Sequence, residues 1–266
     1  MPDYTHLQLR REGPVLIAKL HNAPRNLMNA VMVRELTDLA DSLVDDADTR
    51  VLVLTGEGDI FITHYDVDEL VRLADRMQGT AGVPGGSELH GTHKLFLKLE
   101  SLPQIVIAAI NGTAMGGGCE LALACDFRLM ARGSSRIGLP EVRVGILPGA
   151  GGTQRLARLL GAAKAMELML MGDAVDADIA GRIGLVHRTC DANQLMPEAL
   201  AFAQELAKRP PLSVALIKRL VHRGAGMPFE DALRLEQDAF WQTMRSPDAA
   251  RLMREYLAGD VSIDGF

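Results

Sequence analysis

The sequence predicts an α/β fold whose layered core is followed by a helical region, and three observations support this class. Short apolar runs at Val15–Leu20 and Val51–Leu54 are typical of buried strands, and Asn29–Leu43 between them has helical spacing. This order of strand, helix and strand indicates crossover units. After Asp191 the strand patterns end and only helical patterns follow. Because 48% of the 266 residues are hydrophobic, a large core can form.

The middle of the chain continues this alternation. Asp66–Met77 is predicted to be a helix, because its apolar residues recur with the helical period. Gln78–Ser87 has the composition of a loop, which either borders a substrate mouth or is a plain surface excursion. The continuous apolar run Ile105–Ile110 is typical of a buried strand, and Leu121–Cys125 is typical of a buried helix.

The rest of the chain completes the core and then becomes helical. Strands are predicted at Phe127–Ala131 and Leu185–His187, and helices at Gly151–Leu160 and Lys164–Met171. Four more helices are predicted after Asp191: 194–208, 211–222, 229–244 and 248–257. We therefore divide the chain into a core over residues 1–195 and a C-terminal helical region over residues 196–266.

Bulk properties exclude several classes of function. The formal net charge of −6 disfavours nucleic-acid binding, which requires a basic surface. No apolar run approaches the roughly 20 residues of a membrane helix, and the first residues lack the apolar core of a signal peptide. The cysteines Cys119, Cys125 and Cys190 have no paired spacing, which fits a reducing compartment. We expect a cytoplasmic protein that binds neither nucleic acid nor a membrane.

Two clusters of titratable residues have more than one interpretation. The basic cluster consists of Lys218, Arg219, His222 and Arg223. We interpret it as a solvated helix face, and binding of cofactor phosphates is the alternative. His90 and His93 have an H-x-x-H spacing that could bind a metal, but no further ligand supports such a site. An amphipathic helix start is therefore preferred there, and no metal site is predicted.

The segment Asn111–Glu120, which reads NGTAMGGGCE, is the most informative motif of the chain. It follows a predicted strand and leads into a predicted helix, so a glycine-rich turn precedes a helix start. The free backbone N–H groups of a helix start can bind an anion or a developing oxyanion. Glu120 lies three residues after Gly117, close to one helical turn. A carboxylate and an oxyanion-binding N–H can thus share one side, although a glycine-rich packing turn is the alternative.

A second segment, Leu139–Leu156, carries another acid ahead of another glycine-rich helix start. The acid is Glu141. Together the two segments resemble the enoyl-CoA hydratase/isomerase (crotonase) superfamily, because both occur in the family's order and at nearly its separation. The resemblance covers most of the chain and is strongest from Ile105 to Leu160.

The resemblance implies a fold, a ligand class and an assembly. The fold is a crotonase-like spiral of ββα turns with a C-terminal helical region that packs at a trimer interface. The implied substrate is an acyl-CoA thioester. No metal or redox cofactor is required, because CoA is part of the substrate. The implied assembly is a homotrimer, or a homohexamer made of two trimers.

Members of the superfamily hold the thioester oxygen with two backbone N–H groups. One of them corresponds to Gly117. The other lies in a loop of the form F-x-A-G-A-D, which reads FITHYD over Phe61–Asp66 here, and it corresponds to Tyr65. His64 replaces a glycine of that pattern and can strain the loop, which is therefore intact, reshaped or collapsed. The His64 and Tyr65 side chains either take part in the chemistry or serve packing and turn geometry.

The acids Glu120 and Glu141 correspond to the two glutamates that hold water in the family's hydratases. The resemblance therefore implies an enoyl-CoA hydratase, in which Glu120 accepts a proton from water and Glu141 protonates C2 of a 2,3-enoyl-CoA. Isomerases of the superfamily often keep only the acid that corresponds to Glu141, so an isomerase, a hydrolase or a lyase is an alternative. A non-catalytic acyl-CoA-binding or assembly protein is the alternative of another class.

Three residues are expected to bind substrate. His64 and Asp66 flank Tyr65 in the FITHYD loop. Arg25 lies in Ala23–Ala30, a segment that resembles the family's nucleotide-side loop. It is a candidate phosphate contact, and an exposed, solvated arginine is the alternative interpretation.

Overall fold

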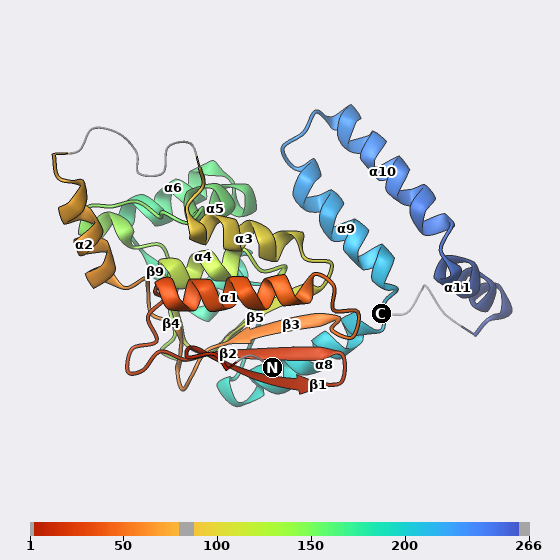
Figure 1. The fold of residues 1–266 in the computed structure, drawn as a ribbon, viewed down its shortest axis with the longest axis horizontal. Helices are drawn as coiled ribbons and strands as arrows, with labels where there is room; N and C mark the ends of the chain where they lie inside the picture. The colour runs from red at the N-terminus through yellow and green to blue at the C-terminus, as the bar shows by residue number, and fades with distance from the viewer. Residues whose placement is uncertain (1–2, 80–87, 261–266) are drawn as a thin grey trace.

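Two β-sheets organise the chain in the computed structural model, which describes residues 3–79 and 88–260 (Figure 1). The large sheet has the order β1-β2-β3-β5-β7-β10 and the small sheet the order β4-β6-β8-β9. The strands of the large sheet are β1 (Leu7–Glu12), β2 (Val15–Leu20), β3 (Val51–Thr55), β5 (Ile105–Ile110), β7 (Phe127–Ala131) and β10 (Arg188–Cys190). Those of the small sheet are β4 (Ile60–Ile62), β6 (Thr113–Met115), β8 (Ile137–Gly138) and β9 (Ala174–Val175).

Successive strands alternate between the two sheets. In the pairs β3/β4, β5/β6 and β7/β8, the first strand joins the large sheet and the second joins the small sheet. From β2 onward the neighbours in the large sheet are parallel, as the pairing of Val51 with Ile105 illustrates, whereas β1 is antiparallel to β2. A helix then carries the chain back to start the next pair. This arrangement confirms the predicted spiral of ββα turns.

Helices surround both sheets. Those of the core are α1 (Ala30–Leu43), α2 (Val67–Met77), α3 (Gly91–Ser101), α4 (Gly117–Leu123), α5 (Gly152–Leu160), α6 (Ala162–Met171), α7 (Ala177–Arg182) and α8 (Leu195–Ala207). They are followed by α9 (Pro211–Gly224), α10 (Phe229–Met244) and α11 (Pro247–Ala258), and two 3-10 turns, η1 (Glu141–Val144) and η2 (Ala192–Gln194), lie between core elements. In the described part of the chain, no helix is long and apolar enough to cross a membrane.

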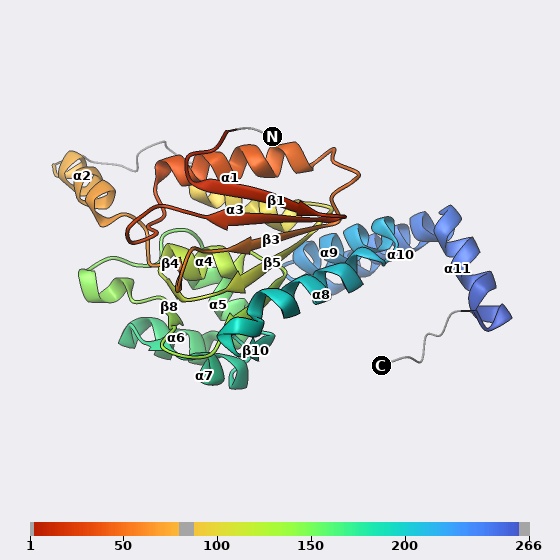
Figure 2. The same cartoon turned by 90° about the horizontal axis from the view of Figure 1, so that it is seen from below.

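The strands β2, β3 and β5 of the large sheet are buried on both faces, which explains their continuous apolar sequences. One face carries Leu16, Leu52 and Val106, which pack in a core cluster with α1, α3 and α4. The other face carries Ile17 and Val53, whose cluster includes apolar side chains of α8. Figure 2 shows α1 and α3 on one side of the sheet and α8 on the other. Helix α8 therefore packs on the sheet, and the division at residue 195 stays a prediction.

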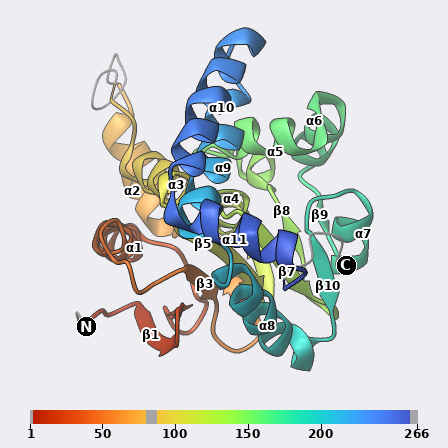
Figure 3. The same cartoon turned by 90° about the vertical axis from the view of Figure 1, so that its right-hand side faces the viewer.

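Helices α9, α10 and α11 project from one side of the core (Figures 1 and 2), and Figure 3 views the molecule from that side, with α10 and α11 in front of the core. Helix α9 contacts α3, α10 packs on α9, and α11 contacts α10. This C-terminal arm, residues 211–258, exposes large apolar side chains. They include Ile217, Val221, Phe229, Phe240, Trp241, Met253 and Leu257. Such a concentration of exposed apolar surface indicates an interaction face.

A buried ion pair attaches the arm to the core. Lys218 is 6% exposed, and its Nζ lies 2.8 Å from Asp126 Oδ2. Nζ also donates to the carbonyl oxygens of Leu99 and Gln104, at 2.9 and 2.8 Å. The interpretation of the basic cluster as a solvated face is therefore wrong for Lys218, although its three neighbours in that cluster are exposed. The helical pattern did not reveal that the Lys218 side chain points from α9 into the core.

Two strands differ from the sequence prediction. Strand β1 was not predicted, because its polar residues follow the exposed outer edge of the sheet. The last strand is Arg188–Cys190 rather than Leu185–His187. Leu185 instead closes α7, since its N–H donates to Ala180 O at 2.8 Å, and its side chain is buried. Gln78 and Gly79 follow α2 as a turn, and residues 80–87 of the predicted loop lie outside the described residues.

Replacing Lys218 with Met should lower the free energy of unfolding by about 3–5 kcal/mol, because Asp126 stays shielded from water after losing its cation. Urea unfolding followed by circular dichroism measures this change. Lys208→Met is the matched control, because the Lys208–Glu205 pair is exposed on α8 and should leave the midpoint unchanged. Equal midpoints for the two variants would contradict the anchoring role of Lys218.

Candidate active site

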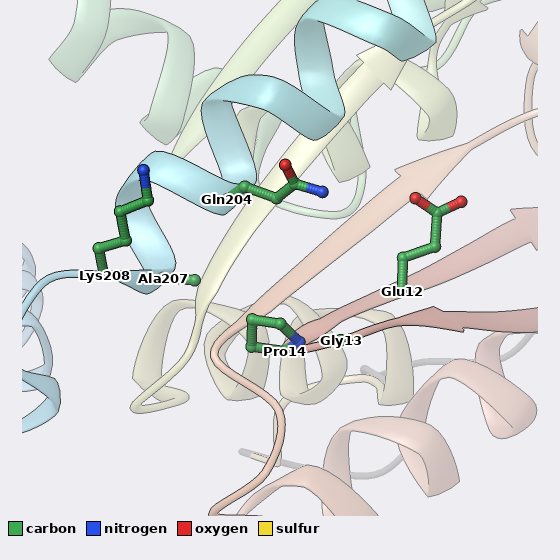
Figure 4. Close-up of a pocket in the computed structure, with 6 residues that line it drawn as sticks. All are labelled: Glu12, Gly13, Pro14, Gln204, Ala207 and Lys208. Atoms are coloured by element: carbon green, nitrogen blue, oxygen red, sulfur yellow. The ribbon is translucent and has the colours of Figure 1, made fainter.

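A cavity of about 870 Å³ lies where the loop after β4 and the start of α4 meet α2, η1 and the turn before α5. Five of the residues predicted from the sequence line it: His64, Tyr65, Gly117, Glu120 and Glu141. Figure 4 shows a smaller recess, where Gly13 and Pro14 meet the end of α8. That recess lies at the N-terminal end of β2, at the opposite edge of the sheet, and contains none of the predicted residues.

The glycine run between β6 and α4 brings backbones into close contact. Gly116 has φ +53° and precedes the first residue of α4. A Cβ on Gly116 would stand 3.1 Å from Glu141 Oε1, and one on Gly118 would stand 2.4 Å from the carbonyl oxygen of Ile62. A side chain at either position would push α4 away from the neighbouring loop. The glycines therefore allow the start of α4 to lie against the FITHYD loop and η1.

The backbones of Gly117 and Tyr65 meet beside this helix start. A Cβ built on Gly117 would lie 3.6 Å from Tyr65 N and 3.6 Å from Tyr65 Cβ, so the two residues are in contact. The N–H of Gly117 is in the first turn of α4, where no intrahelical acceptor exists. Tyr65 N has no hydrogen-bond partner among the described residues. Both residues line the cavity, and neither N–H group is used by another described residue.

The FITHYD loop is held in place by the segment that precedes α1. Thr63 N donates to Asn26 O at 3.2 Å, Met28 N donates to His64 O at 3.0 Å, and Asp66 N donates to Met28 O at 2.7 Å. Asn26 is the one non-glycine residue with positive φ in the described part of the chain, so His64 is not in the left-handed region. The His64 that replaces the family's glycine is accommodated without that strain. Tyr65 N lies beside Gly117 in this loop.

The side chains of the loop bind to neighbouring protein groups. His64 Nδ1 donates to Tyr65 O at 2.7 Å, and His64 Nε2 lies 3.2 Å from Nη2 of the exposed Arg25. Tyr65 Oη donates to Glu69 Oε2 at 3.0 Å. Burial, together with the nearby Glu69 carboxylate, raises the pKa of Tyr65, which keeps the phenol protonated.

Arg25 and Asp66 do not line the cavity. The Asp66 carboxylate caps α2 by accepting from Asp68 N at 2.9 Å. The Arg25 side chain contacts His64, and the Arg25 carbonyl oxygen accepts from Thr63 Oγ1 in the same loop. Their proposed contacts with substrate stay predictions.

Glu120 is a nearly buried carboxyl group, 3% exposed, in the first turn of α4. Its Oε1 accepts from Ala150 N at 2.7 Å and from Gly152 N at 2.8 Å. The second glycine-rich helix start thus binds this carboxylate. Burial raises the pKa of Glu120, while the two N–H groups and Arg155 oppose the rise. Its Oε2 accepts no hydrogen bond within the described residues, so one oxygen is fixed and the other is left to a ligand.

Glu141 is the first residue of η1 and faces the same cavity. Its Oε2 is buried without a hydrogen-bond partner in the described part of the chain. Burial raises the pKa of Glu141 to about 7, and the negative charge of Glu120 contributes to the rise. Near neutral pH this carboxyl group can therefore carry a proton, whereas at Glu120 two backbone N–H groups and Arg155 oppose the effect of burial. Pairs of carboxyl groups whose environments differ in this way divide into an acid and a base.

Sequence reasoning missed the contribution of α2 to the cavity. Glu69, Arg72, Leu73 and Arg76 line it from one face of that helix. Their spacing of three and four residues can be read from the sequence and places them on one helix face. The sequence does not show that this face meets the cavity. Glu69 also accepts from Ala30 N at 3.1 Å, which joins α2 to the start of α1.

His90 caps α3 by accepting from Thr92 N at 3.4 Å. This agrees with the preferred interpretation of the H-x-x-H spacing as part of a helix start. Among the described residues, no group of three or more His, Cys, Asp or Glu is arranged to hold a metal ion.

The two-sheet spiral, with paired backbone N–H groups beside two carboxyl groups, defines a crotonase-fold protein. Comparison with known proteins names the family. The model of the enoyl-CoA hydratase/isomerase family matches residues 10–258, and the chain belongs to this family.

Relatives and solved structures agree over nearly the whole chain. The chain is 34% identical to the short-chain-enoyl-CoA hydratase of Clostridium acetobutylicum, over 99% of this chain and 98% of that protein. It is also 34% identical to the crotonyl-CoA hydratase of Syntrophomonas wolfei, over 96% and 95%. A crystal structure of an enoyl-CoA hydratase from Bacillus anthracis superposes with a TM-score of 0.85 at 31% identity, covering 96% of this chain and 97% of that one.

Replacing Glu141 with Gln should change how stability depends on pH. The folded chain holds the Glu141 proton up to about pH 7, whereas the ordinary pKa is 4.5. At this group the folded state therefore binds more protons between these values, and the contribution of Glu141 to wild-type stability falls as pH rises through this window. Gln cannot ionise, so the stability of the variant relative to wild type should increase from about pH 4.5 to 7 and then level off. Urea titrations across this range measure the difference, and a difference independent of pH would contradict the raised pKa.

Proposed function

We propose that the protein is an enoyl-CoA hydratase, which adds water across the 2,3 double bond of an enoyl-CoA thioester. One observation carries the proposal. Glu120, with one fixed and one free oxygen, and Glu141, with its pKa raised to about 7, face the same cavity as the N–H groups of Tyr65 and Gly117. Membership in the enoyl-CoA hydratase/isomerase family and relatives that are named as hydratases support it.

The two N–H groups would stabilise negative charge on the thioester oxygen. Attack at C3 moves electron density through the double bond onto this oxygen, and donors that already point at it need no reorganisation. One such donor contributes about 10²–10³ in rate. Gly117 also lies at the positive end of the α4 dipole. The proposed oxyanion hole therefore combines two directed hydrogen bonds with a helix end.

The two carboxyl groups would handle the protons. Oε2 of ionised Glu120 orients a water molecule and accepts one of its protons as the water oxygen bonds to C3. Protonated Glu141 delivers its proton to C2 on the same face, so the addition is syn. At the end of the step Glu120 is protonated and Glu141 is ionised, and proton exchange with solvent restores the starting state. The step forms a C–O bond at C3 and a C–H bond at C2 at the expense of the double bond, with no external oxidant or reductant, and the proposal includes no metal or redox cofactor.

The cavity walls suit an acyl-CoA. Leu70, Leu73, Ile146 and Leu147 supply apolar surface for a hydrocarbon chain. The guanidinium groups of Arg72 and Arg76 line the same cavity and favour a ligand that carries negative charge. An acyl-CoA combines an apolar chain with phosphate groups.

Glu120 distinguishes the proposed hydratase from an isomerase. Moving a double bond from position 3 to position 2 needs one group that shuttles a proton, which Glu141 could supply alone. The chain instead also holds Glu120 with the backbone N–H groups of Ala150 and Gly152. A Cβ at position 152 would lie 2.9 Å from Glu120 Oε1, so this close approach requires a glycine there. A water-binding second carboxyl group is therefore favoured.

Purified protein should hydrate crotonyl-CoA, which is measured as loss of the enoyl-thioester absorbance and formation of 3-hydroxybutyryl-CoA. Glu120→Gln and Glu141→Gln should each lower kcat by roughly 10²–10⁴, because each removes a general acid or base. Glu167→Gln, which alters an exposed ion pair on α6, is the control and should retain full activity. Release of free CoA, or activity with a 3-enoyl-CoA alone, would instead identify a hydrolase or an isomerase.

The same assay tests the oxyanion hole through Tyr65. Tyr65→Ala keeps the backbone N–H and should retain most of the activity, whereas Tyr65→Pro removes it and should lose about 10²–10³ in kcat. Full loss in Tyr65→Ala would show that the phenol takes part directly. Binding of acyl-CoA without turnover of any thioester would indicate a non-catalytic binding protein.

We further propose that the protein forms a homotrimer or a homohexamer through its C-terminal arm. The most exposed apolar side chains of the arm are Phe229 at 78% and Leu257 at 83%, and Trp241 is 49% exposed. Leaving such a surface in water is costly, and a second copy of the chain offers the same apolar face.

Size-exclusion chromatography with light scattering should give three or six times the mass of one chain. Phe229→Asp together with Leu257→Asp should shift the sample toward monomer, because the arm would then place charge at an apolar contact. Val44→Asp, which alters an exposed apolar residue outside the arm, is the control. A monomeric wild type at micromolar concentration would refute the assembly.

A further inference from the structure

The turn at residues 150–152, which binds Glu120, is itself held by Arg155, and Arg155 forms an ion pair with Glu100. Arg155 of α5 donates from Nη1 to Ala150 O at 3.0 Å, on the same residue whose N–H binds Glu120 Oε1. The guanidinium also occupies the space beside Gly151, where a Cβ would lie 2.2 Å from Nη1. Arg155 thus holds the carbonyl group of Ala150 while the N–H of the same residue binds Glu120.

Helix α3 fixes Arg155 in turn. Glu100 Oε1 accepts from Arg155 Nε at 2.5 Å, and the two side chains are 16% and 13% exposed. The guanidinium also lies over the ring of Phe96, 5.7 Å from its centre. An arginine held by a carboxylate, a carbonyl oxygen and an aromatic face has one arrangement available to it. Neither Arg155 nor Glu100 lines the cavity, so neither is placed to touch the substrate.

The positive charge of Arg155 also affects the pKa of Glu120, in addition to the hydrogen bond by which Arg155 holds the turn. Arg155 is the cation that opposes the rise in the pKa of Glu120. The other titratable groups around the network are Cys119 on α4, Glu141 on η1, and Glu100 and His93 on α3. Burial raises the pKa of Cys119, and His93 has its pKa lowered by burial, so both are neutral near pH 7. Arg155 is therefore the positive charge that favours ionised Glu120.

We propose that Arg155, anchored by Glu100, is a positioning residue that keeps Glu120 ionised and directs its Oε2 into the cavity, and thereby makes Glu120 the base and Glu141 the acid. The proposal rests on the proposed hydratase function for its kinetic consequence. Without Arg155, two carboxyl groups in one buried cavity would compete for the same proton, and neither assignment would be fixed. With it, their titrations are separated.

The pH profile of kcat for crotonyl-CoA hydration tests this inference. The acid limb follows ionisation of Glu120, and the alkaline limb follows loss of the Glu141 proton. Arg155→Gln should move the acid limb to higher pH and leave the alkaline limb in place, so the profile narrows from one side. On the acid limb the rate falls tenfold for each pH unit of movement. A uniform loss of rate with both limbs unmoved would overturn the proposal, because damage to the fold alone would produce it.

Further variants separate charge from packing. Arg155→Lys keeps the positive charge and should keep the acid limb close to wild type. Glu100→Gln keeps an acceptor for Arg155 while removing a competing negative charge, so the limb should stay in place or move to lower pH. The double variant Glu100→Gln/Arg155→Gln leaves no unpaired carboxylate on α3 and should show the same upward shift as Arg155→Gln. Wild-type behaviour of the double variant would contradict the proposal.

Arg158→Gln is the matched control, because Arg158 is an exposed cation on the same helix, and both limbs should stay unmoved. A readout that does not need turnover keeps the inference separate from the hydratase function. Carboxyl ¹³C NMR, with the Glu120 signal assigned by its loss in Glu120→Gln, should show a higher pKa for Glu120 in Arg155→Gln. No change in this pKa would refute the role of Arg155, whereas a wild type that titrates as expected but hydrates no enoyl-CoA would refute the proposed function alone.

Discussion

The pair of hydrogen bonds from the turn at residues 150–152 to Glu120 is the interaction on which the site depends. A carboxylate that is 3% exposed would be very unfavourable without partners, and the two N–H groups supply them. They also consume one oxygen, so the remaining oxygen is the one that meets a ligand. Three features are arranged around the Glu120 carboxylate: the start of α4, the turn before α5, and the Arg155–Glu100 ion pair that holds this turn. The neighbouring Glu141, with an unpartnered buried oxygen, is the less stabilised member of the pair.

The spiral makes this concentration of groups geometrically feasible. Each turn of the spiral leaves the large sheet at the end of a parallel strand and adds a short strand to the small sheet before its helix begins. Loops far apart in sequence therefore end at the same edge. The FITHYD loop, the glycine run of α4 and η1 follow three successive strands of the large sheet in this way. Because the central strands of that sheet are packed on both faces, their carboxyl ends cannot shift easily. The loops that follow these strands are therefore held at fixed positions.

Sequence patterns predicted the parts of the molecule whose physics is local. Continuous apolar runs gave β2, β3 and β5, and the glycine run with its acid gave the start of α4. Long-range partners were not readable in the same way. Nothing in a helical pattern shows that Lys218 turns inward to Asp126, or that the backbone of Ala150 and Gly152 faces Glu120. The conformation of His64 was likewise undetermined, because it depends on Asn26 and Met28 in another segment. Strand β1 was missed since its outer edge is polar, as edge strands commonly are.

The order in which the chain is synthesised gives the Lys218 anchor a further meaning. Its partners Leu99, Gln104 and Asp126 emerge from the ribosome well before Lys218, which lies 119 residues after Leu99. Synthesis proceeds from the N-terminus, so the core segments are available to fold before α9 is. The nascent core must therefore wait for α9 with an acidic side chain still without its cation. The core is therefore completed only near the end of synthesis. A truncated product that stops before α9 lacks the arm and also leaves Asp126 without the Lys218 cation.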